Sequence, residues 1–401
     1  MSTGRLSELK IRLQSLAVFR ALLEDPVINA LCRYLNDVGQ VDTAEAVSRY
    51  AEFVSRLYGA GNASLAHYVR GIVNDNENPY IRLIGKGETP SGEMECCVEQ
   101  DLATLQAAAD LTPELLREGL DWSGFLPAFP VEKVDIAGHY RERCAKIGQY
   151  GYGIYARYRM FYMNTEQHIV PVRNPDPIRL SSLVDYKREQ EIILNNTLAL
   201  LDGKPAANIL LTGDAGTGKS STVKAIVNEL YDRGLRILEV RKEQLHAIPD
   251  ILDTLNSNPL KFILFIDDLS FQKGDDNYSA LKAILEGSVS AKARNVVIYA
   301  TSNRRHLVKE SFSDREGDEI HRNDTMQEII SLSERFGIQI TFQKPDKQTY
   351  LDIVRHLAME RGVCRDAAEL ELLAEQFALK RGGRSARAAS QFIDSLVAAK
   401  Q

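Results

Sequence analysis

The sequence predicts an α/β protein built on a five-stranded parallel sheet, with a mainly helical N-terminal domain before it and a small helical lid after it. Two observations predict the sheet. A glycine-rich octet, GDAGTGKS at 213–220, stands between an apolar run and a helical stretch. Apolar runs and helical stretches then alternate strictly, which is typical of a parallel sheet. The expected strands lie near 208–213, 235–240, 262–267, 295–300 and 337–342.

Length and composition set the outer limits. A chain of 401 residues is too long for one ordinary core, so two or three domains are expected. The formal net charge of −6 gives no overall basic surface, so any nucleic-acid contact must come from a local patch. No apolar run has the length of a membrane span, and the start is a poor secretory signal. The five cysteines lack metal-ligand spacing, so we expect free thiols in a reducing cytoplasm.

The main boundary is a proline-rich segment, VPVRNPDPIRLSSLV at 170–184. Its prolines argue against a helix and for extended chain. We therefore expect a helical domain of unknown role at 1–170, a linker at 171–184, an α/β domain at 185–345 and a helical lid at 346–401.

The octet predicts a phosphate-binding loop, because a strand, a glycine-rich turn and a helix follow one another there. The three glycines allow backbone dihedrals that a side chain would forbid, so successive N–H groups can point at phosphate oxygens. The new helix adds its unpaired N-terminal amides. Lys219 can reach the β- and γ-phosphates, and the Ser220 hydroxyl suits a Mg²⁺ ligand position.

We therefore predict that this loop binds a nucleoside triphosphate. The alternative, a glycine turn that only connects strand to helix, is disfavoured by the match at all eight positions. The predicted nucleotide contacts are Gly213, Asp214, Ala215, Gly216, Thr217, Gly218, Lys219, Ser220 and Ser221.

Two acids follow the buried strand in KFILFIDDLSF at 261–271. Asp267 and Asp268 emerge at its carboxyl end, where open α/β sheets bind their ligands. We expect Asp267 to orient Mg²⁺ and Asp268 to polarise an attacking water. The alternative is that both acids only cap the next helix, which the phosphate-binding loop upstream makes the weaker interpretation.

Three later residues are candidates for the same chemistry. Asn303, at the end of the strand in NVVIYATSNRRHL, could hydrogen-bond the γ-phosphate and the water, or stand in an ordinary turn. Arg335, in LSERFGIQITF, could be an arginine finger for a neighbouring subunit, or a surface ion-pair partner. RGGRSARAASQFID places Arg384 at the start of a late helix, with Arg387 one turn on.

Together these segments resemble the AAA+ ATPase superfamily over about 180–400. GDAGTGKS, FILFIDD, YATSN, SERFG and GGRSARAASQFI resemble Walker A, Walker B, sensor 1, the arginine finger and sensor 2. The SERFG segment is similar to one in Holliday-junction branch-migration motors, and GGRSAR is similar to the lid of Clp-type unfoldases. LTGDAGTGKSSTVKA, DDLSF and YATSNRRHL more closely resemble an uncharacterised bacterial ATPase family, domain of unknown function 815, and this resemblance extends into the N-terminal region.

The resemblance implies a P-loop module with helices on both faces of its sheet, ATP and Mg²⁺ as ligands, and a homo-oligomer, most often a hexamer. It implies that the sensor 2 arginine is Arg384 rather than Arg387, and that adenine lies near Leu183 and Val184. Most AAA+ proteins carry Asp-Glu where this chain has Asp267-Asp268. The shorter acid would place its carboxylate about 1–1.5 Å back, which favours slow hydrolysis.

Three function classes compete. The first is an oligomeric ATPase that remodels a protein or nucleic-acid partner, the second an ATP-gated binding scaffold with little turnover. The third is a small-molecule kinase, the weakest, because a lid arginine and a finger suit an assembly better than a small acceptor pocket.

Two further segments leave the partner open. In YGYGIYARYRMFYMN at 150–164, aromatic residues surround Arg157 and Arg159, which could hold single-stranded nucleic acid. We favour a core face formed by Tyr155, Tyr158 and Tyr162 at helical spacing. The acidic stretch at 308–325 is predicted to be a mobile, solvated loop.

Overall fold

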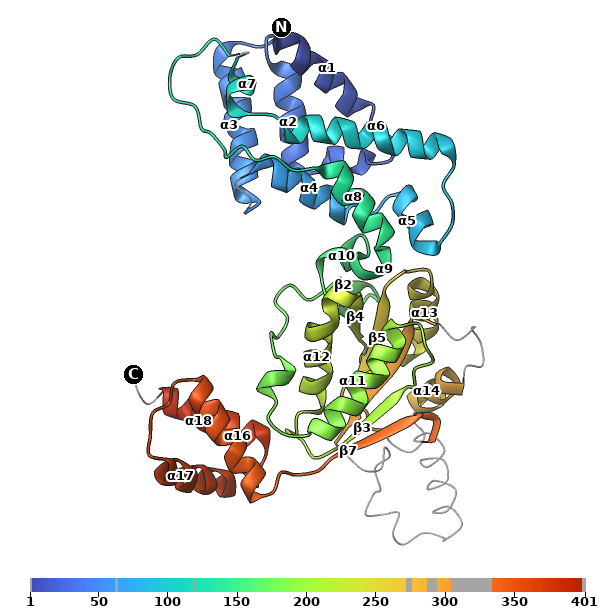
Figure 1. Ribbon diagram of the computed structural model, residues 1–401, viewed down its shortest axis with the longest axis vertical. Coiled ribbons are helices and arrows are strands. Elements are labelled where there is room, and N and C mark those ends of the chain that lie inside the picture. Colours follow the sequence, from blue (N-terminus) through green and yellow to red (C-terminus); the bar gives the residue numbers. More distant parts are fainter. Residues whose placement is uncertain are drawn as a thin grey trace. The chain divides into compact units, whose positions relative to one another are not determined.

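The computed structural model describes residues 2–61, 64–118, 120–271, 276–286, 294–303 and 334–398. The chain divides into two compact units, Met1–Arg157 and Tyr158–Gln401 (Figure 1). The acidic stretch at 308–325 lies outside the described residues. None of the described helices is long and apolar enough to cross a membrane. All five cysteines are free thiols.

The first unit is helical, as predicted. Side-chain caps start most of its helices: Asp25, for example, accepts hydrogen bonds from the N–H groups of Val27 and Ile28. A single apolar core fills the unit, with Tyr34, Phe53 and other large side chains fully buried. The helices are α1 (Ser2–Gln14), α2 (Pro26–Asp37), α3 (Thr43–Gly59), α4 (Leu65–Asp75), α5 (Pro79–Lys86), α6 (Gly92–Ala109), α7 (Pro113–Arg117), α8 (Ile136–Ala145), α9 (Ile147–Tyr150) and α10 (Ile154–Arg157).

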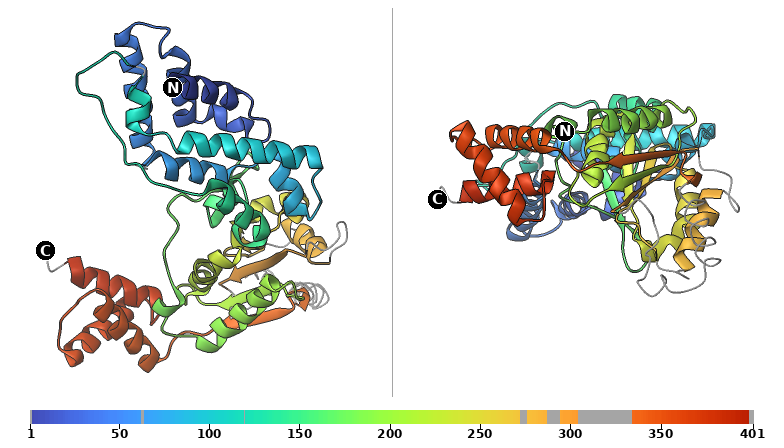
Figure 2. Two further views of the ribbon diagram at one scale, coloured as in Figure 1. Left: turned by 45° about the horizontal axis from the view of Figure 1, so that its top comes forward. Right: turned by 90° about the horizontal axis from the view of Figure 1, so that it is seen from below.

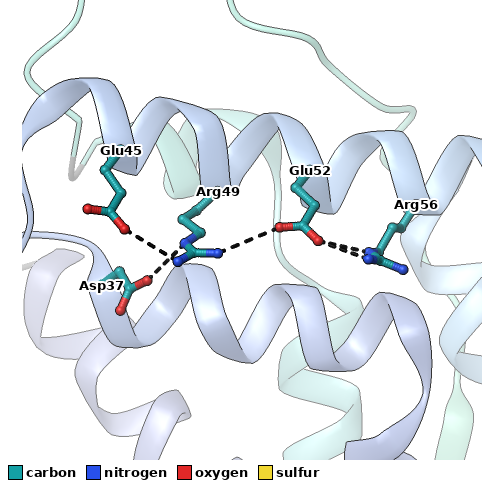
Figure 3. Close-up of polar contacts among 5 residues, drawn as sticks. All are labelled: Asp37, Glu45, Arg49, Glu52 and Arg56. Carbon is teal, nitrogen blue, oxygen red and sulfur yellow. Dashed lines mark hydrogen bonds and ion pairs between the residues drawn. The ribbon is translucent and has the colours of Figure 1, made fainter.

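A network of charges joins α2 to α3 on the surface of this unit (Figure 3). The Arg49 guanidinium lies 3.2 Å from the Asp37 carboxylate on α2, and 3.3 Å and 3.9 Å from Glu45 and Glu52 on its own helix. Glu52 also pairs with Arg56 at 2.9 Å. Arg49 therefore ties two helices together through three carboxylates.

The second unit contains one sheet of seven strands in the order β2-β1-β4-β5-β6-β3-β7. The five predicted strands are present, and each pairs with its neighbours in parallel, which confirms the fold class. The strands are β1 (Met160–Met163), β2 (Ile169–Pro171), β3 (Ile209–Gly213), β4 (Leu235–Glu239), β5 (Lys261–Ile266), β6 (Val296–Ser302) and β7 (Ile338–Phe342).

Strands β1 and β2 were not expected. They precede the segment predicted as a linker, yet β1 pairs in parallel with β4, and β2 pairs antiparallel with β1. The sheet therefore begins well before residue 185, where we expected the α/β domain to start. Residues 172–179 carry neither helix nor strand, which agrees with the extended chain predicted from the prolines.

The prediction that Tyr155, Tyr158 and Tyr162 form one face of a helix is wrong. Residues 150–164 do not form one helix, because α10 ends at Arg157 and β1 begins at Met160. Phe161 is buried on β1, whereas Tyr162 points the other way and is 40% exposed. The helical spacing of the tyrosines has no structural meaning here, because the chain changes from helix to strand within the segment.

Helices cover both faces of the sheet (Figure 2, right). Alternate apolar side chains of the strands pack against α11 (Lys187–Leu201) and α12 (Lys219–Leu230) in one core. The other face is covered by α13 (Ile248–Asn256) and α14 (Asp276–Glu286). Within the described residues, the 3₁₀ turns are η1 (Arg20–Glu24), η2 (Leu180–Ser182), η3 (Tyr231–Arg233) and η4 (Lys242–Ala247).

The predicted lid is present as three helices with their own small core, in which Tyr350, Val354, Ala374 and Phe392 are buried. These helices are α16 (Lys347–Glu360), α17 (Ala367–Lys380) and α18 (Ala386–Ala398).

Candidate functional site

The strand order creates a crevice at the carboxyl edge of the sheet. Strand β3 lies between β6 and β7, whereas the next strand along the chain, β4, lies beyond both β6 and β5. The connection from β3 runs to β4 on one side, whereas the connection from its neighbour β6 runs to β7 on the other side, and ligands of open α/β sheets bind at such a point. The glycine-rich loop follows β3, the paired acids follow β5, and Asn303 follows β6. All three segments meet at this edge.

The loop has the backbone that its glycines predict. Gly218, with φ of 92°, caps the start of α12 in the left-handed region that favours glycine. At Gly213 a Cβ would lie only 2.1 Å from the Phe342 carbonyl oxygen of β7, so no side chain fits there. The Thr217 hydroxyl closes the turn by donating to the Asp214 carbonyl at 2.9 Å. The loop thus folds tightly over the end of β3.

Lys219 is buried at the centre of the site. Its Nζ donates to the carbonyl oxygens of Gly213 and Asp214, both at 2.8 Å, and to Asn303 Oδ1 at 3.0 Å. Burial lowers the pKa of Lys219, while the carboxylates of Asp267, Asp214 and Asp268 act in the opposite direction. The ammonium group is therefore a desolvated positive charge that three acceptors hold in place.

Asp267 and Ser220 meet next to this lysine. Ser220 Oγ donates to Asp267 Oδ1 at 2.6 Å, and Thr301 Oγ1 donates to the same oxygen at 2.5 Å. A hydroxyl and a carboxylate in contact are oxygen donors of the kind that Mg²⁺ prefers. This donor set fits the magnesium site that the sequence predicts.

Asp268 has an unusual backbone conformation, with φ of 55°. Its N–H donates to Thr301 Oγ1 at 2.9 Å, and its Oδ1 accepts from Asn303 Nδ2 at 2.6 Å. Asn303 therefore touches both Lys219 and Asp268. The two acids, the lysine and the asparagine form one continuous network of polar contacts.

These residues line a cavity of about 900 Å³. The volume suits a nucleotide, since pockets for small ligands measure about 300–1,000 Å³. Leu183 and Val184, expected near adenine, lie in its wall, and the lid contributes Ile353 and Leu357. Among the predicted loop residues, those that line the cavity are Ala215, Gly216, Thr217, Gly218, Lys219, Ser220 and Ser221.

The lid arginine in the cavity is Arg387 and not Arg384. Arg387 lines the cavity, and its backbone N–H donates to the Gly216 carbonyl at 3.3 Å. The Arg384 guanidinium instead forms a two-armed ion pair with Glu375 on α17, at 2.9 Å and 2.7 Å. This pairing raises the pKa of Arg384 and lowers that of Glu375. The structure does not bring Arg384 to the site, because the lid's own carboxylate holds it.

Arg335 also lies outside the residues that line the cavity. It stands just before β7 and pairs with Glu286 at the end of α14. An arginine finger acts on the site of another subunit, so this position leaves the prediction for Arg335 open.

Thr301 was missed by the sequence analysis. It is buried on β6 and bonds to both acids through one hydroxyl. Its position two residues before Asn303, near the end of the strand that Asn303 follows, was the available signal, since side chains at that spacing in extended chain point to the same face.

Two solved structures similar to this chain are of a RuvB protein. The Thermotoga maritima RuvB Holliday junction branch migration motor has 17% sequence identity and a TM-score of 0.37 over 54% of this chain and 63% of that chain. A point variant of it has 18% identity and a TM-score of 0.38 over 56% of this chain and 67% of that chain. The alignment to the first of these thus spans less than two thirds of its length.

No curated protein matches this chain significantly in sequence. A family described as "Protein of unknown function (DUF815)" matches residues 155–400. The match does not include the helical unit before residue 155, into which we expected the resemblance to extend. It does include the whole sheet, the glycine-rich loop, the paired acids and the helical lid, and it covers more than half of the chain. The chain therefore belongs to the DUF815 family.

Proposed function

We propose that this protein is a Mg²⁺-dependent, homo-oligomeric ATPase that hydrolyses ATP slowly and uses it to remodel a macromolecular partner. The observation that carries the proposal is the connected network at the sheet edge. It joins a phosphate-loop lysine, a hydroxyl–carboxylate pair and a second carboxylate held by an asparagine, all in the wall of one cavity.

Lys219 and the loop amides would bind the phosphates. The lysine charge is buried, so an anionic oxygen near Nζ would meet little competition from water. Ser220 and Asp267 would hold Mg²⁺, which neutralises phosphate charge when bound. Thr301 keeps the Asp267 carboxylate oriented toward Ser220.

Asp268 would act as the general base that polarises an attacking water. Asn303 donates to its carboxylate and accepts from Lys219, so it fixes the distance between the base and the phosphate end of the cavity. Arg387 from the lid and Arg335 from a neighbouring subunit would supply further positive charge to the transferred phosphoryl group.

The nucleotide site is tested by two variants. We expect Lys219→Ala to abolish ATP binding, because this side chain would contact phosphates in the ground state. Asp268→Asn should bind ATP normally and lose turnover, because its carboxylate matters only when water attacks. Equilibrium binding and steady-state phosphate release measure the two properties. Turnover of Asp268→Asn at the wild-type rate would show that another group is the base.

A binding scaffold gated by ATP remains the second candidate, favoured by the short acid at position 268. Phosphate release measured with and without cell extract separates the two functions. An ATPase that remodels a partner should be stimulated by extract, whereas a scaffold should retain its low rate. ATP consumption in proportion to one added metabolite would instead indicate a small-molecule kinase.

A further inference from the structure

Asn228 connects the helix that follows the glycine-rich loop to a segment that lines the cavity. It lies on α12, the helix that begins with Lys219 and Ser220, and it is buried with 5% of its surface exposed. Its Nδ2 donates to the carbonyl oxygens of Asp176 and Ile178, at 2.9 Å and 2.8 Å. One side-chain amide thus holds the two carbonyls on either side of Pro177.

The segment that Asn228 holds, residues 176–179, is called the strap here. It has no helix or strand of its own, so its position depends on such tertiary contacts. The strap also bonds back to the helix: Arg179 Nη1 donates to the Asn228 carbonyl at 3.0 Å and lies 3.5 Å from the Glu229 carboxylate. Side chains of both the strap and the helix therefore donate hydrogen bonds across this contact.

The strap is held about 13 Å along α12 from Lys219, because Asn228 lies nine residues further on in that helix. Asp176, Pro177 and Ile178 line the cavity, and the chain continues from them to Leu183 and Val184 in the same wall. The residues that would hold phosphate and Mg²⁺ stand instead at the carboxyl ends of β3, β5 and β6. A nucleotide whose phosphates lie on the loop would present its nucleoside to the strap wall.

We propose that Asn228 is a positioning residue that fixes the strap as the nucleoside-binding wall of the cavity. It sets the affinity for the base and ribose and leaves phosphate binding unaffected. This inference rests on the proposed nucleotide-binding function. It predicts that the two parts of the ligand respond differently to substitution at Asn228.

The test compares ATP with inorganic tripolyphosphate, each with Mg²⁺, by isothermal titration calorimetry on the full chain. Tripolyphosphate carries the phosphates without the nucleoside. We expect Asn228→Ala to weaken ATP binding about tenfold, because two hydrogen bonds to the strap are lost. Its affinity for tripolyphosphate should stay within about twofold of the wild type, since removal of the strap contacts leaves the loop intact.

Asn196→Ala is the matched control. Asn196 on α11 likewise bonds to backbone, through two contacts of 2.9 Å with Ala207, but it does not line the cavity. The Asn196→Ala variant should bind both ATP and tripolyphosphate with the affinity of the wild type. If Asn228→Ala fails to fold, Arg179→Ala removes the opposite contact from a half-exposed position and should weaken ATP binding about threefold, with tripolyphosphate unaffected.

The outcomes distinguish a failure of the proposed nucleotide-binding function from a failure of the positioning role of Asn228. A wild-type protein that binds neither ligand would refute the proposed function itself. A wild-type protein that binds both, with Asn228→Ala losing both affinities equally, would show that Asn228 only supports the helix. Unchanged ATP affinity in Asn228→Ala would equally overturn the positioning role.

Discussion

Asp268, the residue proposed as the general base, adopts a left-handed backbone conformation. With φ of 55°, the residue lies in a region where aspartate and asparagine are several-fold enriched among non-glycine residues. Its carboxylate reaches Asn303 from this conformation. A longer acid would carry its oxygens past that contact. The departure from the common Asp-Glu pair thus agrees with the local backbone.

We expect Asp268→Glu to lower the rate of ATP hydrolysis, proposed to be slow already in the wild type, by about a further 10- to 100-fold. The reason is that the carboxylate would be displaced by about 1 Å from Asn303. ATP affinity should not change. Phosphate release at saturating ATP measures the effect, and a rate above that of the wild type would show that the short acid limits the chemistry.

Motifs predict the residues of this site better than spacing does. Lys219, Ser220 and Asp267 meet as expected, since a loop and a strand end fix their places. Which of Arg384 and Arg387 lines the cavity depends on where α18 begins and on which of the two forms an ion pair with a carboxylate of the lid. Glu375 lies on α17, outside the segment that contains both arginines, so that segment alone does not show that Arg384 forms the ion pair.

At the scale of secondary-structure elements, the contact between α2 and α3 depends in part on Arg49. We expect Arg49→Met to destabilise the protein by about 1 kcal/mol, because a network of three carboxylates loses its common partner while the apolar stem is kept. Thermal unfolding monitored by circular dichroism measures the loss. The loss should shrink in 1 M NaCl, since salt screens exposed charges.

Arg365→Met is the control for that experiment. Arg365 forms a single exposed pair with Glu369 on the lid, at 2.8 Å. Such a pair contributes about 0.3–0.5 kcal/mol. Equal losses for the two variants would mean that the network between helices adds nothing beyond one pair.

The elements of the sheet were predictable wherever an apolar run was long. β5 and β6 are buried along almost their whole length and are evident from sequence. β1 and β2 have four and three residues; β2 pairs with β1, and β1 pairs with β4. The strand that joins this short pair to the sheet is distant in sequence, so local patterns do not reveal the pair.

At the scale of the whole molecule, we expect head-to-tail assembly with ATP and Mg²⁺. Arg335→Ala should bind ATP normally and hydrolyse it poorly, because a finger acts on the neighbouring subunit and contributes about 10³–10⁵ in rate. A mixture with Lys219→Ala should partly regain activity, since some interfaces then join an intact loop to an intact finger. Phosphate release from the mixture, with light scattering to show mixed assemblies, measures the rescue.

Mixed assemblies without any rescue would make Arg335 a structural arginine. Its ion pair with Glu286 would then be its main role, and the ATP-gated scaffold would become the leading function. A Glu286→Gln variant is a useful companion, because it releases Arg335 from this carboxylate without touching the cavity. Under the finger hypothesis its turnover should be at least that of the wild type.

Because Lys219 already makes three hydrogen bonds, a bound ligand would have to replace one of the acceptors. The Nζ group has three donors, and two loop carbonyls and Asn303 already accept from them. An incoming group must outcompete neutral oxygens for this ammonium. A charged phosphate oxygen can do so, since it adds the Coulomb attraction between two opposite charges, which a neutral oxygen does not offer. A nucleoside without phosphates offers only neutral acceptors. The lysine would thus favour anionic ligands over neutral ones, whatever the rest of the ligand contacts.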